Sequence, residues 1–312
     1  MREHIITLLI VGVFALNTAK AELSEETARR ADGFAVHKGL IYSNVAGKLK
    51  MDLYLPRKTA EAAPCVIVIQ GGGFRAQDGQ RFRPFAEHLA ENGFAAALIA
   101  YRGQPDHTCK ATIADTKAAV RFVRKISSRY GIDADRIGAM GRSAGATLAA
   151  LLAVTGGVEE LEGYGGHSQF SSRIQAAVGI AGVYDFAARF TVEEQKSLQP
   201  KLDAKLKSNG DWIGAPFSPT NEHWLRASAI NHVDVNDPPM LLIHSRNDGT
   251  VPWMQSRDMH KKMTEAGIKS EIVLSKTGGH GGPPNAKELM VTFFRKVLSK
   301  QDAPAAAAKP RR

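Results

Sequence analysis

Apolar and polar positions change their period repeatedly along the chain, and these changes mark out alternating strands and helices. Residues 48–55 alternate polar and apolar side chains, which is typical of a half-buried strand. Residues 65–69 form an unbroken apolar run, as in a strand buried on both faces of a parallel sheet. Similar short runs predict further strands at residues 94–100, 136–140, 175–180, 239–244 and 270–274.

Helical periodicity fills the intervals between these strands. Apolar side chains recur at helical spacing over residues 113–130, and Gly131 is a typical helix end. Other helices are predicted at residues 82–91, 144–154, 254–266 and 286–298. Strands separated by helices imply βαβ units, so we expect an α/β fold with a mostly parallel, doubly wound sheet of about eight strands.

One internal segment interrupts the alternation. We assign residues 34–299 to a single domain and residues 22–33 to a flexible lead. Residues 184–232 begin with a Lys-rich sequence typical of helices, and aromatic residues follow it. An insertion at this point would lie over the carboxyl ends of the strands. We interpret it as a small cap; a peripheral pair of helices is the alternative.

The N-terminal residues have the pattern of a secretory signal peptide. Basic residues precede an apolar run over residues 5–16, and residues 19–21 read A-x-A. Because a spanning helix needs about 20 apolar residues, the run is too short to cross a bilayer. We expect cleavage near Ala21 and a periplasmic or secreted protein; an uncleaved anchor is the alternative.

Composition and charge exclude few partners. Hydrophobic residues make up 44% of the chain, charged residues 23%, and the net charge is +10. Basic residues are scattered, apart from a low-complexity tail at residues 300–312 that we expect to be disordered. No nucleic-acid-binding motif appears, so we favour solubility over attraction to anionic polymers as the reason for the charge.

Two cysteines would be able to form a disulfide in an exported protein. Cys65 is expected to begin a strand, while Cys109 is expected in a loop beyond the far end of a neighbouring strand. Strand rise of about 3.3 Å per residue would hold them beyond bonding range. We therefore predict that Cys65 is a core residue and that Cys109 is free.

A candidate nucleophile lies between a predicted strand and a predicted helix. Residues 141–145 read Gly-Arg-Ser-Ala-Gly, and glycine on both sides of Ser143 permits a sharp turn from strand to helix. Such a turn raises the Ser143 hydroxyl above the sheet, and the helix N-terminus beneath it favours developing negative charge. The alternative is a tight turn with a structural serine.

A base and an acid follow Ser143 in the order that serine hydrolases on this kind of sheet use. Asp248 comes shortly after the strand at residues 239–244, and His280 lies in a Gly-rich loop after the last strand. His280 would take the serine proton and Asp248 would orient its ring. Asp237 is the alternative candidate for the acid, but it precedes the strand at residues 239–244 and so would lie at the opposite edge of the sheet from Ser143.

A run of three glycines follows the first buried strand. Its backbone N–H groups can turn toward a substrate oxygen, and Gly72, Gly73 and the N–H of Ala144 are our predicted oxyanion hole. Asp115, near a predicted helix start, is expected to cap or to form an ion pair. Arg142 could bind an acidic substrate group, but we favour a structural ion pair, with Asp115 as a possible partner.

These segments together resemble the α/β-hydrolase carboxylesterases that include the hormone-sensitive-lipase-like enzymes and the feruloyl and acetylxylan esterase-like (BD-FAE-like) group. The resemblance spans residues 45–298. It rests on the motifs at residues 70–74, 101–102, 115–124, 141–145, 171–176, 237–239, 248–252 and 279–281. It implies the α/β-hydrolase fold, with Ser143, Asp248 and His280 as the triad.

The chain departs from that group at two positions. Gln70 stands where the family has a histidine before the glycine run, and His244-Ser245 replaces the common His-Gly before the acid loop. Neither change removes a catalytic group. Gln70 is expected to support the glycine loop by hydrogen bonding in place of the histidine.

The sequence therefore predicts an exported carboxylic ester hydrolase that acts through an acyl-enzyme on acetyl, feruloyl or other short-chain esters, free or carried by a polysaccharide. We expect no cofactor and no metal, since the histidines show no ligand spacing. A peptidase or amidase is one alternative, although such enzymes usually carry an N-terminal propeller and about 30 residues precede the first predicted strand. A non-catalytic carbohydrate-binding protein is the other, with Trp212, Trp224 and Trp253 available to stack on sugars or to fill the core.

Overall fold

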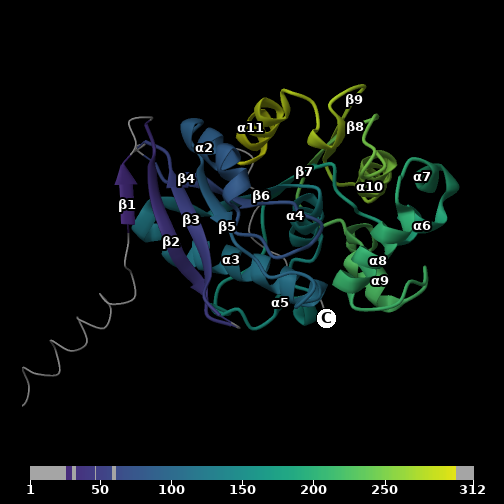
Figure 1. Ribbon diagram of the computed structural model, residues 1–312. Coiled ribbons are helices and arrows are strands. Elements are labelled where there is room, and N and C mark those ends of the chain that lie inside the picture. Colours follow the sequence, from purple (N-terminus) through teal and green to yellow (C-terminus); the bar gives the residue numbers. More distant parts are fainter. Residues whose placement is uncertain (1–25, 30–32, 46, 58–60, 300–312) are drawn as a thin grey trace, which may run out of the picture.

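A nine-stranded sheet with helices on both faces organises the part of the chain that the computed structural model describes, namely residues 26–29, 33–45, 47–57 and 61–299 (Figure 1). The predicted signal peptide and C-terminal tail lie outside these residues. The strand order is β1-β2-β3-β5-β4-β6-β7-β8-β9. The strands are β1 (Glu26–Arg29), β2 (Ala35–Ser43), β3 (Leu49–Leu55), β4 (Ala63–Ile69), β5 (Ala95–Ile99), β6 (Ile132–Arg142), β7 (Ala176–Ile180), β8 (Met240–Ser245) and β9 (Ser270–Ser275).

Most of the sheet is parallel, as the apolar runs predicted. Strands β5, β4, β6, β7, β8 and β9 pair in parallel, whereas β1, β2 and β3 form an antiparallel meander that joins β5. The residues of β5, β7 and β8 are all buried. The predicted α/β fold with a mostly parallel, doubly wound sheet is confirmed, and the strand count of about eight is close to the nine that are described.

The antiparallel edge is where the sequence pattern was least informative. Residues 22–33, expected to be a flexible lead, include strand β1, and β2 was not predicted at all. The pairing of β2 with β3 shifts register between His37 and Leu40, so side chains do not alternate regularly. Gly39 has a φ of 68° there, and its N–H donates to Asp52 Oδ1 at 2.8 Å. This irregularity hides the period that identifies a strand.

Two apolar layers fill the space between the sheet and its helices. One face packs against α3 (Cys109–Tyr130), α4 (Ala144–Val154) and α10 (Met254–Glu265), and the other against α2 (Arg83–Glu91) and α11 (Ala286–Val297). Every residue of α4 is buried. Its small side chains let it lie close to the sheet, and this fixes the position of its N-terminus.

The interrupting segment contains α6 (Phe186–Thr191), α7 (Glu193–Ser197), α8 (Leu202–Ile213), α9 (Glu222–Ala227) and η2 (Ala229–His232). These helices gather at the side of the molecule away from β1 (Figure 1). They contact loops at the carboxyl ends of the strands: Ser208 Oγ accepts from Gln104 after β5, and Arg189 donates to the carbonyl of Thr250 after β8. This position is compatible with the predicted cap.

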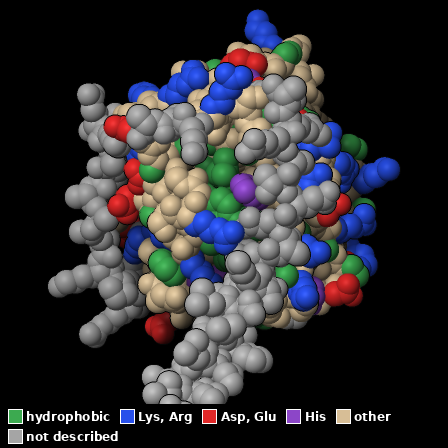
Figure 2. All heavy atoms as spheres, turned by 90° about the vertical axis from the view of Figure 1, so that its left-hand side faces the viewer, with side chains coloured by type: hydrophobic (Ala, Val, Ile, Leu, Met, Phe, Trp, Pro, Cys, Tyr) green, Lys and Arg blue, Asp and Glu red, His purple; other side chains and the backbone are tan. Residues whose placement is uncertain are grey.

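The face at the β1–β2 edge carries Lys and Arg side chains interspersed with Asp and Glu side chains (Figure 2). No described helix is long and apolar enough to cross a membrane. Cys65 lies buried in β4, and Cys109 is the first residue of α3 rather than part of a loop; both are free thiols.

Candidate active site

The turn between β6 and α4 holds Ser143 in an uncommon backbone conformation. Ser143 has φ 57° and ψ −126°, and its N–H donates to the carbonyl of Ile180 at 2.8 Å. A Cβ on Gly141 would lie 2.1 Å from the carbonyl oxygen of Gly145, and a Cβ on Gly145 would lie 2.1 Å from that of Ile69. Both motif glycines are therefore required by close backbone approach, as the Gly-x-Ser-x-Gly pattern predicts. Ser143 itself is half-buried.

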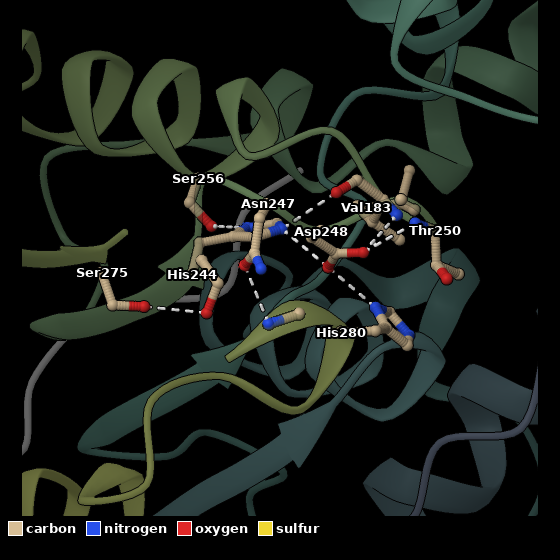
Figure 3. Close-up of polar contacts among 12 residues, drawn as sticks. Val183, His244, Asn247, Asp248, Thr250, Ser256, Ser275 and His280 are labelled. Atoms are coloured by element: carbon tan, nitrogen blue, oxygen red, sulfur yellow. Dashed lines mark hydrogen bonds and ion pairs between the residues drawn. The ribbon is translucent and has the colours of Figure 1, made fainter. Parts of the chain in front are cut away.

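The predicted acid and base lie together. His280, in η3 (Gly279–Gly281), donates from Nδ1 to Asp248 Oδ2 at 2.8 Å (Figure 3). Because the carboxylate can only accept a hydrogen bond, Nδ1 carries the proton. Nε2 then has the free lone pair and is the basic atom of the ring. Asn247 Oδ1 accepts from the N–H of Gly279 at 2.9 Å and so ties the His280 loop to the acid loop. Among the described residues, no hydrogen bond joins Ser143 Oγ to His280.

A second histidine shares the carboxylate of Asp248. His244, at the end of β8, is fully buried and its Nε2 lies 3.2 Å from Asp248 Oδ2 and 3.1 Å from the carbonyl of Val251 (Figure 3). Both neighbours are acceptors, so Nε2 carries a proton; Nδ1 faces Ser256 Oγ at 2.8 Å. The sequence reading did not give His244 a role. Its position four residues before the acid was the available signal.

Asp248 is held as a carboxylate. Its Oδ1 accepts from the N–H groups of Thr250 at 2.7 Å and Val251 at 3.1 Å, in addition to the two histidines on Oδ2. Burial alone would raise the pKa of Asp248, but the hydrogen bonds from His244 and His280 outweigh burial and hold the pKa well below its ordinary value. A negative charge is therefore available to orient His280 and to stabilise its protonated form.

The glycine loop lies against the turn that holds Ser143. A Cβ on Gly71 would meet the carbonyl oxygen of Arg142 at 2.2 Å, and Gly73 has a φ of 63°. Within the described part of the chain, the N–H groups of Gly72, Gly73 and Ala144 donate no hydrogen bond. These are the three predicted oxyanion donors.

Gln70 supports this loop in the manner expected. Its side chain is buried, donates to Gln77 Oε1 and accepts from the N–H of Arg81 at 2.9 Å. Its carbonyl accepts from the Tyr101 hydroxyl at 2.5 Å. The amide thus links Gln70, which precedes the glycine loop, to two residues that follow it.

The suggested pairing of Arg142 with Asp115 is wrong. Asp115 is buried in the second turn of α3 and accepts three hydrogen bonds from the Arg102 guanidinium, the shortest at 2.6 Å. It also accepts from the N–H of Arg102 at 2.9 Å. Arg102 reaches Asp115 on the α3 side of the sheet, whereas the Arg142 guanidinium lies over Phe82 in the other apolar layer.

Two of the three tryptophans are core residues. Trp212 and Trp224 are fully buried, and Trp212 stacks on Phe74 with ring centroids 3.9 Å apart. Neither face is open to a sugar, which removes the stacking argument for a carbohydrate-binding protein from these two residues. Trp253 is half-buried and lies beneath the Arg246 guanidinium at 4.2 Å.

Metal ligands do not gather in the described residues: no group of three or more His, Cys, Asp or Glu side chains is placed to hold an ion. The site consists of a serine at a strand-to-helix turn, a hydrogen-bonded Asp–His pair, and backbone N–H groups that have no partner among the described residues, all at the carboxyl ends of parallel strands. Sheet order, turn and site together define an α/β hydrolase.

The comparisons with known proteins give the family. The model of the BD-FAE family matches residues 51–263, which is more than half of the chain. The chain belongs to the BD-FAE family, as the sequence resemblance predicted. It is 33% identical over 196 residues to the probable carboxylic ester hydrolase LipM of Mycobacterium tuberculosis, covering 62% of this chain and 43% of that protein.

Other relatives extend the same picture. The isoprenylcysteine alpha-carbonyl methylesterase ICME of Arabidopsis thaliana is 27% identical, covering 77% of this chain and 55% of its own. The chain thus spans about half the length of the curated relatives it matches. Among solved structures, a truncated carbohydrate esterase from gut microbiota has a TM-score of 0.74 and 27% identity, covering 87% of this chain and 99% of its own. Esterase 2 of Thermogutta terrifontis has a TM-score of 0.68 and 26% identity, covering 86% and 94%.

Proposed function

We propose that this protein is a serine carboxylic ester hydrolase that acts through an acyl-enzyme. The observation that carries the proposal is the Asp248–His280 hydrogen bond, formed at the same edge of the sheet as the strained Ser143 turn. A positive φ at a serine is an uncommon conformation that persists where the surrounding structure enforces it, and it is frequent at functional sites. Membership of the BD-FAE family supports the same reaction.

The residues divide the reaction between them. His280 Nε2 takes the proton of Ser143 as Oγ attacks the ester carbonyl, and the Asp248 carboxylate stabilises the resulting imidazolium. The N–H groups of Gly72, Gly73 and Ala144 hold the negative oxygen of the tetrahedral intermediate. His280 then returns the proton to the departing alcohol oxygen. Water attacks the acyl-enzyme by the same route and restores Ser143.

Acetyl or feruloyl esters, carried by polysaccharides or by small alcohols, are the proposed substrates. The support is analogy: the family, and the carbohydrate esterase and Thermogutta esterase among the structural relatives. No cofactor is required by this chemistry.

Export is part of the proposal and rests on residues 1–21, whose basic start, apolar run and A-x-A end match a secretory signal. Expression of the full chain in a bacterial host should give a periplasmic or secreted product whose first residue is Glu22. A product that keeps its N-terminus and stays in the membrane fraction would instead favour the uncleaved anchor.

The activity is tested with p-nitrophenyl esters from acetate to octanoate. The full protein should hydrolyse the short esters, and a fluorophosphonate should label Ser143. Ser143→Ala should abolish both, while Ser127→Ala, at a half-buried helical serine whose hydroxyl donates to the Arg124 carbonyl, should keep both. An anilide series run in parallel tests the amidase alternative. Absence of hydrolysis together with absence of labelling would overturn the proposal.

A further inference from the structure

The residue before the nucleophile carries a cation on the face of the sheet that the helices α2 and α11 cover. Gly141 packs against Gly145 of α4, so the next residue of β6, Arg142, points to the opposite face. Its guanidinium lies over the ring of Phe82, 5.2 Å from the centroid, and the side chain is half-buried.

Within the described part of the chain, no anion neutralises this cation. Asp115 pairs with Arg102, and Arg142 forms no ion pair or side-chain hydrogen bond with any described residue. Arg81 is exposed nearby, and burial together with this second cation lowers the pKa of Arg142. Glu87, the acidic residue nearest in sequence on α2, pairs with Arg83 at 3.5 Å. A half-buried guanidinium that lies beside another cation and has no acidic partner is more typical of a ligand-binding site than of a structural ion pair.

Arg142 also lies between two parts of the proposed catalytic machinery. In the sheet it is the register partner of Ile180, and a Cβ on Gly282, two residues after His280, would lie 2.9 Å from Ile180 Cγ2. The His280 loop therefore covers the neighbouring position on the same face. On the other side, the N–H of Arg81 donates to Gln70, the residue that holds the glycine loop.

We propose that Arg142, assisted by Arg81, forms a subsite for a carboxylate on the alcohol part of the ester. The inference rests on the proposed function. His280 must reach the departing oxygen to protonate it, so the alcohol part lies on the side of the His280 loop, where Arg142 lies. A guanidinium presents paired donors that match a carboxylate, and the partly buried setting strengthens the attraction.

The test uses two acetyl esters that differ in one charge, 3-acetoxybenzoate and its neutral analogue 3-acetoxybenzamide. The quantity measured is the ratio of kcat/KM for the anion to kcat/KM for the amide. Wild type should favour the anion, and Arg142→Gln should lower the ratio by about tenfold or more, as expected for loss of a charge-assisted hydrogen bond. Arg142→Lys should retain part of the preference, and Arg81→Gln should lower the ratio less than Arg142→Gln. Raising the salt concentration from about 0.05 to 0.5 M should reduce the wild-type ratio.

Arg83→Gln, which removes a nearby exposed arginine already paired with Glu87, is the matched control and should leave the ratio unchanged. Thermal midpoints of all variants show that they are folded. A ratio that stays at the wild-type value in a folded Arg142→Gln overturns the subsite while leaving the esterase proposal intact. Failure of the wild type to hydrolyse even the neutral ester overturns the esterase proposal and the subsite with it.

Discussion

At the scale of single residues, Asp248 accepts more hydrogen bonds than the orientation of one histidine requires. Four donors reach Asp248: His280, His244 and the N–H groups of Thr250 and Val251. The motif spacing identified Asp248 and His280 correctly as neighbours. It gave His244 no role, because its place four residues before Asp248 does not tell which way the ring points; the packed structure turns the ring toward the acid.

We expect His244→Phe to weaken the fold more than the chemistry. The variant removes one donor from a buried carboxylate, so the free energy of unfolding should fall by about 1.5–3 kcal/mol. The bond from His280 remains, so kcat on p-nitrophenyl acetate should fall less than in Asp248→Asn. Urea unfolding and kcat on the same samples provide the check. His260→Phe is the control, because His260 also lies against a serine, Ser270, at 3.0 Å, but is not among the described residues that donate to Asp248. A wild-type unfolding curve for His244→Phe would contradict the expectation.

At the scale of elements, the strand-to-helix turn and the helix pair α3–α5 show two ways of fixing position. The turn does so through glycines that admit no Cβ, and the pattern of residues 141–145 predicted this. The pair of α3 with α5 (Glu159–Glu162) does so through charge: Lys117 is fully buried and donates to Glu162 at 2.7 Å, and Arg121 pairs with the same carboxylate at 2.8 Å. No sequence pattern indicated this contact, since its members are 45 and 41 residues apart.

Gly145→Ala should damage the turn. Its Cβ would lie 2.1 Å from the carbonyl oxygen of Ile69, so β4 and α4 must separate. We expect a loss of about 1–3 kcal/mol in the free energy of unfolding, with esterase activity falling alongside. In Gly210→Ala, inside α8, the nearest atom lies at 3.4 Å, and the change should be neutral or should stabilise the helix by about 0.5–1 kcal/mol. Equal stability of the two variants would be evidence against close approach at the turn.

Glu162→Gln should lower the free energy of unfolding more than Glu193→Gln does. Burial raises the pKa of Glu162, but Lys117, Ser172 and Arg121 outweigh burial and lower it, so the group is charged in the folded protein. Removing the charge leaves two buried cations uncompensated. Because Glu162 keeps 28% exposure, we expect a loss at the low end for a buried pair, about 3 kcal/mol in chemical unfolding at pH 7. Glu193→Gln, at a surface pair with Lys196, should change stability by less than about 1 kcal/mol. Similar losses in both variants would show that the buried network contributes little.

At the scale of the whole molecule, stability against acid depends on carboxylates whose pKa values the fold has moved. The pKa of Asp248 is lowered in the folded state, so its contribution is present above the unfolded value near 3.8 and is lost as the pH falls through the folded value. The pKa of Asp115 is raised by burial despite the Arg102 pair, and its contribution has the opposite sign.

Comparison of wild type with Asp248→Asn isolates the Asp248 contribution, because Asp115 is common to both proteins. We expect the difference in thermal midpoint to be largest at pH 5–7 and to shrink steadily below about pH 3.8, where Asp248 of the unfolded chain takes up a proton while the folded protein still holds the carboxylate. Midpoints recorded at pH intervals down to the acid limit of reversible unfolding provide the measurement. A difference that is constant with pH would mean that the Asp248 charge contributes nothing to the fold.

The sequence by itself determined the fold class, the family and the three candidate catalytic positions, because apolar runs, helical stripes and glycine-flanked motifs are local signals. The tertiary structure decided what depends on residues distant in sequence: that His244 and His280 share Asp248, that Asp115 pairs with Arg102, that Trp212 and Trp224 are core, and that Arg142 has no acidic partner among the residues that the structure describes. Strand β2 was also decided by the tertiary structure, since the register shift between His37 and Leu40 removes its alternation, and pairing with β1 and β3 supplies the order that the local pattern lacks. Contacts of this kind are set by which strand ends the sheet brings together, and a linear pattern does not contain that information.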